Sequence, residues 1–288
     1  MPDFFGFAAI ATKMMLYFGV LTSTGLVISA LLFAAPLDAI KKDVRKYAIA
    51  FGALGYLASI VSFSLRGAAL TGDASGMTDS DILGILLETQ VGTVFYLRMA
   101  GMAAMLIGLL IGGKGYWLSL AGGLVTIWCF AEIGHVPGLE GFWLQLLLAA
   151  HLTVAAFWIG VFIPLRKLAL NSTQYSQAAE LGHGFGRVAS IAVPVLLVAG
   201  VVLSWKLVGS VQALYSTGYG IALMAKVGVV TALLGLAAAN KLRFVPALQN
   251  GRPDAGHSLA RAIRFEWVCV FGIFLATATF TSILSVPT

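Results

Sequence analysis

Long apolar runs separated by short polar connections repeat along the whole chain. A helix that crosses a bilayer needs roughly 20 mostly apolar residues, and the apolar residues here run continuously instead of alternating, which favours helices over a membrane β-barrel. The pattern predicts an all-α fold, a polytopic membrane helical bundle of about eight transmembrane helices. The predicted spans are approximately Lys13–Pro36, Arg45–Leu65, Thr93–Gly112, Tyr116–Ile133, Phe142–Leu165, Val188–Val208, Thr217–Asn240 and Ile263–Leu284.

Composition narrows the class of protein further. Of 288 residues, 59% are hydrophobic and 10% are charged, whereas a soluble domain carries about 25% charged residues. A water-soluble globule, a disordered chain and a nucleic-acid-binding protein are therefore excluded despite the net charge of +6. The 2 cysteines are too few for a disulfide scaffold or a four-cysteine zinc site. The composition therefore predicts a single integral membrane domain over residues 1–288.

The distribution of basic residues predicts how the helices are oriented. Cytoplasmic loops of membrane proteins retain Lys and Arg. Here the first, third, fifth and seventh connections hold almost all of them, including Lys41, Lys114, Lys167 and Arg252. We expect these connections to be cytoplasmic, and both termini and the loops near residues 67–92, 134–141 and 209–216 to face the periplasm. The start of the chain lacks a basic region and is expected to be mature protein, not a signal peptide.

Within the first periplasmic loop, the segment Asp79–Glu88 has the pattern of a short amphipathic helix capped by Asp79. Its apolar side predicts a position at the membrane interface.

Ionisable residues inside the spans are few, and such residues usually face the bundle interior because burial in lipid is costly. A rise of 1.5 Å per residue places Met102, His151 and Lys226 roughly 14 Å below the periplasmic surface, with Arg98 and Glu132 shallower. We expect a buried polar network that includes Arg98 and Lys226. Glu266 lies close in sequence to Arg261 and Arg264 and is predicted to be a salt-bridged anchor at the cytoplasmic end.

The residue types in the outer half favour copper over harder ions. Glu132 and His135 share one face of a helix, and Met99, Met102 and Met105 follow the same three-residue step. Thioether and imidazole ligands suit copper, particularly Cu(I). The candidate metal ligands are His135, His151, Glu132, Met99 and Met102.

Each candidate has a structural alternative. The methionine stripe is also typical of simple packing, and Glu132 has a second interpretation as the countercharge of Arg98. His183 and His257 are predicted to be solvated loop histidines.

Several segments together resemble the CopD/PcoD-type copper resistance proteins. The resemblance is closest over residues 132–288 and looser in the first three spans, where it rests on Thr89–Gly92 and Arg98. The segments that carry it are Glu132–His135, His151–Gly160, Pro164–Leu165, Gly186–Arg187, Ser204–Trp205, Thr217–Lys226, Asn240–Pro246 and Arg261–Glu266.

This resemblance implies copper handling or transport across the bacterial inner membrane, and a contribution to copper resistance and homeostasis. It implies His135 and His151 as metal positions, and a separate periplasmic copper-binding protein of the CopC type as partner. The sequence contains no ATPase phosphorylation motif or P-loop. We therefore expect a protein that is not an enzyme and that depends on gradients or on delivery by a partner.

Two other functions remain open at this point. Small helical bundles with intramembrane histidines also hold b-type haem, although His151 is the only mid-span histidine and His135 lies roughly 10 Å or more away along the membrane normal. The other function is that of a non-transporting docking or assembly subunit for a periplasmic copper protein.

Overall fold

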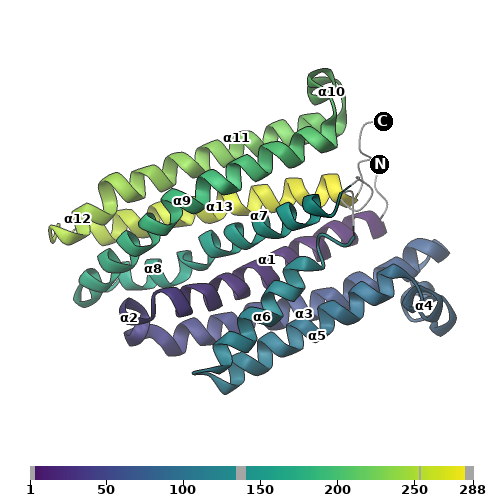
Figure 1. The fold of residues 1–288 in the computed structure, drawn as a ribbon, viewed down its shortest axis with the longest axis horizontal. Helices are drawn as coiled ribbons and strands as arrows, with labels where there is room; N and C mark the ends of the chain where they lie inside the picture. The colour runs from purple at the N-terminus through teal and green to yellow at the C-terminus, as the bar shows by residue number, and fades with distance from the viewer. Residues whose placement is uncertain (1–3, 134–140, 253, 283–288) are drawn as a thin grey trace.

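The computed structural model describes residues 4–133, 141–252 and 254–282, and these residues form a helical bundle without strands (Figure 1). Eight long helices are joined by short helices and turns. The long helices are α1 (Phe4–Leu32), α3 (Lys41–Thr71), α5 (Gln90–Ile111), α6 (Gly115–Trp128), α7 (Phe142–Gly160), α9 (Tyr175–Val208), α11 (Gly218–Ala239) and α13 (Ala255–Ser282). The short elements are α2 (Ala34–Leu37), η1 (Asp38–Ile40), η2 (Ala74–Met77), α4 (Ser80–Leu87), α8 (Phe162–Ala169), η3 (Ser172–Gln174), α10 (Val211–Ser216), η4 (Asn240–Phe244) and α12 (Val245–Gln249). The predicted all-α fold class is confirmed.

Each of the eight predicted spans coincides with one long helix, and six helical segments of the described chain are long and apolar enough to cross a membrane. These six contain α1, α3, α5, α7, α9 and α11. The other two are α6, which has 14 residues, and α13, which has 28 residues and carries Arg261, Arg264 and Glu266 in its first half. The count of eight crossings stays a prediction.

Several helices extend further than the apolar runs that predicted them, whereas α6 ends at Trp128, before the predicted end at Ile133. Helix α9 begins at Tyr175, before the predicted start at Val188, and α13 begins at Ala255. His183 and His257 therefore lie on helices and not in loops as predicted, although both side chains are exposed as expected. A hydropathy pattern detects only the apolar part of a helix, whereas the backbone hydrogen bonds continue into the polar part.

Helix α1 occupies the centre of the bundle. It packs against α3 and α6 on one side and against α7 and α13 on the other (Figure 1). Val20, Leu21 and Leu26 of α1 are completely buried. Near the middle of this helix, the ring of Tyr17 stacks on Phe130 with centroids 4.8 Å apart. The first and second halves of the chain are therefore held together through α1.

Small residues allow α1 and α7 to approach closely. A Cβ atom on Gly25 would overlap the backbone of Ala156, and one on Gly160 would overlap the backbone of Gly25. Such contacts are typical of helix pairs in membranes, where association depends on close packing and not on the hydrophobic effect.

The two ends of the bundle differ in character. Figure 1 shows α2, α8 and α12 at one end, and α4, α10, the start of α1 and the end of α13 at the other. Lys41, Lys167 and Arg252 all belong to the first of these ends. There, Lys167 forms an ion pair of 3.0 Å with Asp43. The structure thus gathers the predicted cytoplasmic connections at one end; which side of the membrane this end faces stays a prediction.

The short helix predicted in the first periplasmic loop is confirmed as α4. The side chain of Asp79 accepts hydrogen bonds from the backbone N–H groups of Asp81 and Ile82, at 2.9 and 3.1 Å. This is the N-cap arrangement that the sequence predicts.

Candidate functional site

His151 lies midway along α7 and its imidazole contacts α9. The Nδ1 atom is 3.0 Å from the carbonyl oxygen of Leu196. Gly200 lies one turn further along α9, where a Cβ atom would be 3.3 Å from Cε1 of His151. When Nδ1 donates its proton to this carbonyl, Nε2 is left unprotonated with a lone pair available to a metal. Histidines that bind metals are commonly held in this way, by a hydrogen bond from the second ring nitrogen.

Lys226 and Arg98, the two cations predicted to share a buried polar network, lie in different parts of the bundle. Lys226, on α11, is near enough to His151 for its charge to act on the imidazole. Arg98, on α5, donates from Nη2 to the carbonyl oxygen of Cys129 across 3.4 Å, and its guanidinium lies 5.4 Å from the ring centroid of Phe130. Within the described ranges these two cations lie on α11 and α5, and a network that includes both stays a prediction.

Glu132 lies in a bend beyond the end of α6 at Trp128, and not on a helix as predicted. Its carbonyl oxygen accepts a hydrogen bond of 3.2 Å from the side chain of Gln90. Among the residues that the structure describes, no ion pair links Glu132 to Arg98. The alternative in which Glu132 neutralises Arg98 is therefore not formed in this structure. His135, the predicted partner of Glu132, lies outside the described residues.

Met102 and Met105 are completely buried on α5. Ser59 of α3 donates to the Met102 sulfur across 3.7 Å, and Ser23 and Thr24 of α1 donate to the Met105 sulfur across 3.5 and 3.7 Å. These hydroxyl groups and the thioethers fill the space between the three helices. The arrangement supports the packing interpretation of the methionine stripe, and a ligand role for Met102 stays a prediction.

Met99 lies one turn before Met102 and is half-buried. A ligand role for Met99 likewise stays a prediction.

The predicted candidates do not converge on one place. Met102 packs on α3, whereas His151 packs on α9, and α1 lies between these two regions (Figure 1). Within the described ranges, no three His, Cys, Asp or Glu side chains are close enough together to hold a metal ion. The sequence predicts that Met102 and His151 lie at the same depth in the membrane, but in the structure these two residues are not neighbours.

Two family models match this chain and together cover most of it. The model described as "Copper resistance protein D-like, N-terminal domain" matches residues 1–146, and the model described as "Copper resistance protein D" matches residues 179–280. The chain belongs to the copper resistance protein D family. In this family member, the first model covers α1 to α6 and the second covers most of α9 to α13.

Two curated relatives carry names that refer to copper. "Copper resistance protein D" of Pseudomonas syringae pv. tomato is 25% identical over 235 residues, which cover 76% of each chain. "Copper transport protein CutJ" of Bacillus subtilis (strain 168) is 27% identical over 218 residues, which cover 70% of this chain but only 38% of CutJ. No solved structure matches this member of the copper resistance protein D family.

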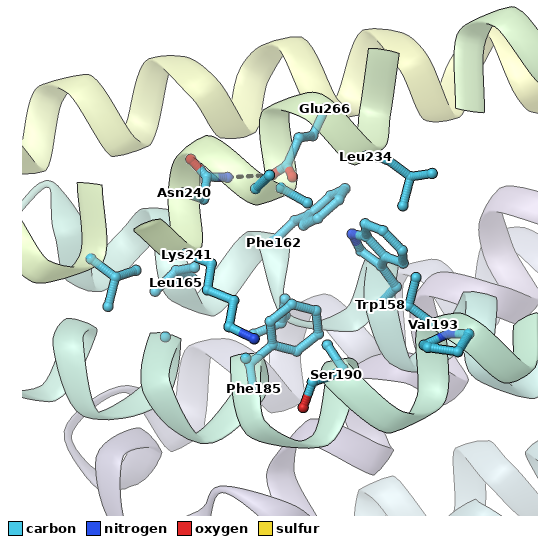
Figure 2. Close-up of a pocket in the computed structure, with 18 residues that line it drawn as sticks. Trp158, Phe162, Leu165, Phe185, Ser190, Val193, Leu234, Asn240, Lys241 and Glu266 are labelled. Carbon is cyan, nitrogen blue, oxygen red and sulfur yellow. Dashed lines mark hydrogen bonds between the residues drawn. The ribbon is translucent and has the colours of Figure 1, made fainter. Parts of the chain in front are cut away.

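A cavity of about 300 Å³ lies between helices of the second half of the chain, and no sequence pattern indicates it. Figure 2 shows aromatic side chains around it, among them Trp158, Phe162 and Phe185, together with the polar side chains of Asn240, Lys241 and Glu266. The Nδ2 atom of Asn240 donates to Oε2 of Glu266 across 3.0 Å.

Glu266 corrects a prediction made from the sequence. Only 2% of this residue is exposed, and neither ion pair found among the described residues involves it. It is therefore not a salt-bridged anchor. Arg264 lies two residues away on α13, and positions two apart on a helix do not share a face. The side chain of Glu266 enters the bundle while that of Arg264 is exposed.

The backbone beside Glu266 departs from the regular α-helix. Residues Asn240–Phe244, labelled η4, form a π-helical segment between α11 and α12. Such segments are rare and are frequent at functional sites. Asn240 is the first residue of this segment and the hydrogen-bond partner of Glu266. A tract of Asn, Lys, Leu, Arg and Phe has no sequence signal for a π-helix, which explains why this site was missed.

Proposed function

We propose that this protein transports copper between the periplasm and the cytoplasm across the bacterial inner membrane, through an intramembrane site that includes His151. The family and the names of both relatives support a role in copper handling. The observation that carries the proposed site is the hydrogen bond between His151 Nδ1 and the Leu196 carbonyl, because it leaves Nε2 as a ligand at mid-depth.

In this proposal, copper enters from the periplasmic side near Glu132 and His135 and passes to His151. A separate periplasmic copper-binding protein of the CopC type delivers the ion. The protein is not an enzyme, and the copper is its cargo. Movement between oxygen, sulfur and nitrogen ligands needs no covalent chemistry from the chain, only exchange between sites of comparable strength.

His151→Ala tests the proposed site. Loss of a group that only orients a metal ligand already lowers metal affinity about 10–100-fold, so we expect the loss of a ligand itself to lower copper affinity by more than about tenfold. Copper binding to the purified protein and copper uptake into proteoliposomes that contain a copper reporter are the two measurements.

His183→Ala is the matched control, because His183 is exposed on α9 and lies outside the proposed route. Equal copper binding and uptake by the His151→Ala, His183→Ala and parent proteins would contradict the site. A parent protein that binds copper and gives no flux would instead favour the docking function. A haem absorption band in protein from haem-replete cells would favour electron transfer, for which the described residues offer no second histidine beside His151.

A further inference from the structure

We infer that Glu266 is an exchangeable proton site, and that protonation of its side chain in the cavity between α7, α9, α11 and α13 is coupled to copper movement. The coupling part rests on the proposed function, whereas the proton site itself does not. The inference starts from the burial of Glu266, of which only 2% is exposed.

An isolated buried charge is very unfavourable unless a countercharge lies next to it. Among the described residues, no cation lies within ion-pair distance of Glu266. The carboxyl group therefore has two stable forms here: it is neutral and carries a proton, or it is ionised and balanced by a cation in the cavity.

A hydrogen bond from Asn240 holds the carboxyl group in place. Asn240 Nδ2 donates to Oε2 of Glu266, and this oxygen accepts whether or not Oε1 carries a proton. Asn240 Oδ1, which Figure 2 shows turned away from Glu266, is buried without a hydrogen-bond partner. The preference for the protonated form therefore comes from burial without a countercharge and not from this hydrogen bond.

Lys241 offers a countercharge for the ionised form. It lines the same cavity, and Figure 2 shows its ammonium group on the side of Phe185 and Ser190, away from Glu266. Its long, flexible stem permits reorientation. When the O–H bond of Glu266 breaks, the proton passes to water in the cavity, and the ammonium of Lys241 balances the carboxylate that remains. A volume of about 300 Å³ has room for several water molecules.

The other groups around Glu266 do not replace these two roles. Cys269, three residues further along α13, is close enough for the charge of an ionised Glu266 to act on its thiol. Helices α7, α8, α9 and α11 contribute apolar or aromatic side chains and the hydroxyl of Ser190 to the cavity.

The cavity also lies next to the proposed copper site. Trp158 lines the cavity and is seven residues from His151 on α7, which corresponds to about 10 Å along the helix. On α9, Pro194 lines the cavity and Leu196 contacts His151. A change in the charge of the cavity is thus transmitted over one or two helical turns to the carbonyl that positions His151.

The first test measures the proton directly and needs no copper. In an infrared titration of the purified full-length protein, we expect a carbonyl band of a buried carboxylic acid near neutral pH. Glu266→Gln keeps the size and the hydrogen-bond acceptor, and it should abolish this band. Glu180→Gln is the matched control, since Glu180 is exposed on α9. Asn240→Ala should shift the band, because it removes the hydrogen bond to Oε2. The same spectrum for Glu266→Gln and the parent would overturn the proton site.

The second test measures coupling in proteoliposomes that contain a copper reporter. A gradient of one pH unit should change copper accumulation by about tenfold for each coupled proton. In Glu266→Gln, the gradient should have no effect, while copper still equilibrates. An equal effect of the gradient on Glu266→Gln and the parent would overturn the coupling. If the parent moves no copper under any gradient, the proposed function fails, and the infrared titration still decides whether Glu266 binds a proton.

Discussion

Helix α1 and the pair α9 and α11 are similar in apolar character but differ in how much of each is covered by protein. In the most apolar stretch of α1, 67% of the residues are buried, compared with 11% in the corresponding stretches that contain α9 and α11. The apolar side chains of α1 serve the core, whereas those of α9 and α11 largely face outwards. Apolar sequence alone therefore does not distinguish a helix at the centre of a membrane bundle from one at its edge.

The two regions also differ in how closely their polar side chains are packed. Around α1, hydroxyl groups contact thioether sulfurs in a closely packed interior. Between α9, α11 and α13, by contrast, a cavity remains, with the polar side chains of Asn240, Lys241 and Glu266 in its lining. Buried polar atoms without a partner occur in both regions, at Thr22 and Ser29 of α1 as well as at Asn240 and Trp158, so the cavity is what sets the second region apart. The loosely covered half is the one in which we place both the copper site and the proton site.

The largest effect is expected where α1 and α7 touch. Gly160→Leu would drive a side chain into the backbone of Gly25, and because no side-chain movement relieves a clash with backbone, we expect a cost well above the roughly 1–3 kcal/mol of ordinary overpacking. We expect loss of the folded protein or a much lower thermal unfolding temperature in detergent. Gly228→Leu on α11 is the control, because nothing lies within 4 Å of a Cβ there. Equal losses in both variants would mean that the contrast between the two regions is not real.

Two methionines offer a second comparison. Met102 is completely buried, whereas Met224 on α11 is 41% exposed. Met102→Ala should destabilise the protein by about 2–5 kcal/mol, and Met224→Ala by about 0.5 kcal/mol or less, as measured by chemical unfolding in detergent.

Met102→Leu separates packing from metal binding at the same position. A swap of similar volume costs less than about 1.5 kcal/mol, and copper affinity should stay at the parent value if Met102 only packs. A drop of tenfold or more in copper affinity with normal stability would instead establish Met102 as a ligand.

A smaller effect on stability is expected for Gly200→Val. The added side chain reaches the imidazole of His151, since a Cβ there already lies 3.3 Å from Cε1. We expect the ring to be displaced from the Leu196 carbonyl and copper affinity to fall by about 10–100-fold, as when other groups that orient a metal ligand are lost. Isothermal titration with copper measures this, and Gly235→Val, in open space on α11, should match the parent.

The smallest effect is expected on the outer face of α9. Ile191 is 74% exposed, and substitutions away from special features stay within about 0.5 kcal/mol. Ile191→Ala should therefore leave the unfolding temperature, copper binding and oligomeric state unchanged. A marked loss of any one of them would show that this face is covered by another chain, and that α9 is not an edge helix.

Much of the fold was accessible from hydropathy, but the arrangement of the candidate site was not. Continuous apolar runs predict every long helix, because helix formation in lipid depends mainly on length and apolar character. Depth along the membrane follows from residue counting, so Met102 and His151 were placed at one level. Which helix stands beside which depends on side-chain packing, and α1 separates these two residues (Figure 1).

Glu266 shows a second limit of inference from sequence. Its neighbours Arg261 and Arg264 predict a salt bridge, whereas its actual partner, Asn240, is 26 positions away and lies at the start of a π-helical segment. Such a partner depends on tertiary structure, and no local sequence pattern predicts it.

The central position of α1 has a consequence for how the protein is assembled in the cell. Among the described residues, the helices that pack on α1 follow it in the chain, and α7 and α13 come much later than α3. Until they are synthesised, one side of α1 has only lipid or the insertion machinery as its neighbour. The helix that precedes its partners therefore reaches its final surroundings only after the last of them, α13, has been inserted. A chain truncated before α13 would leave the side of α1 that packs on α13 without its protein neighbour.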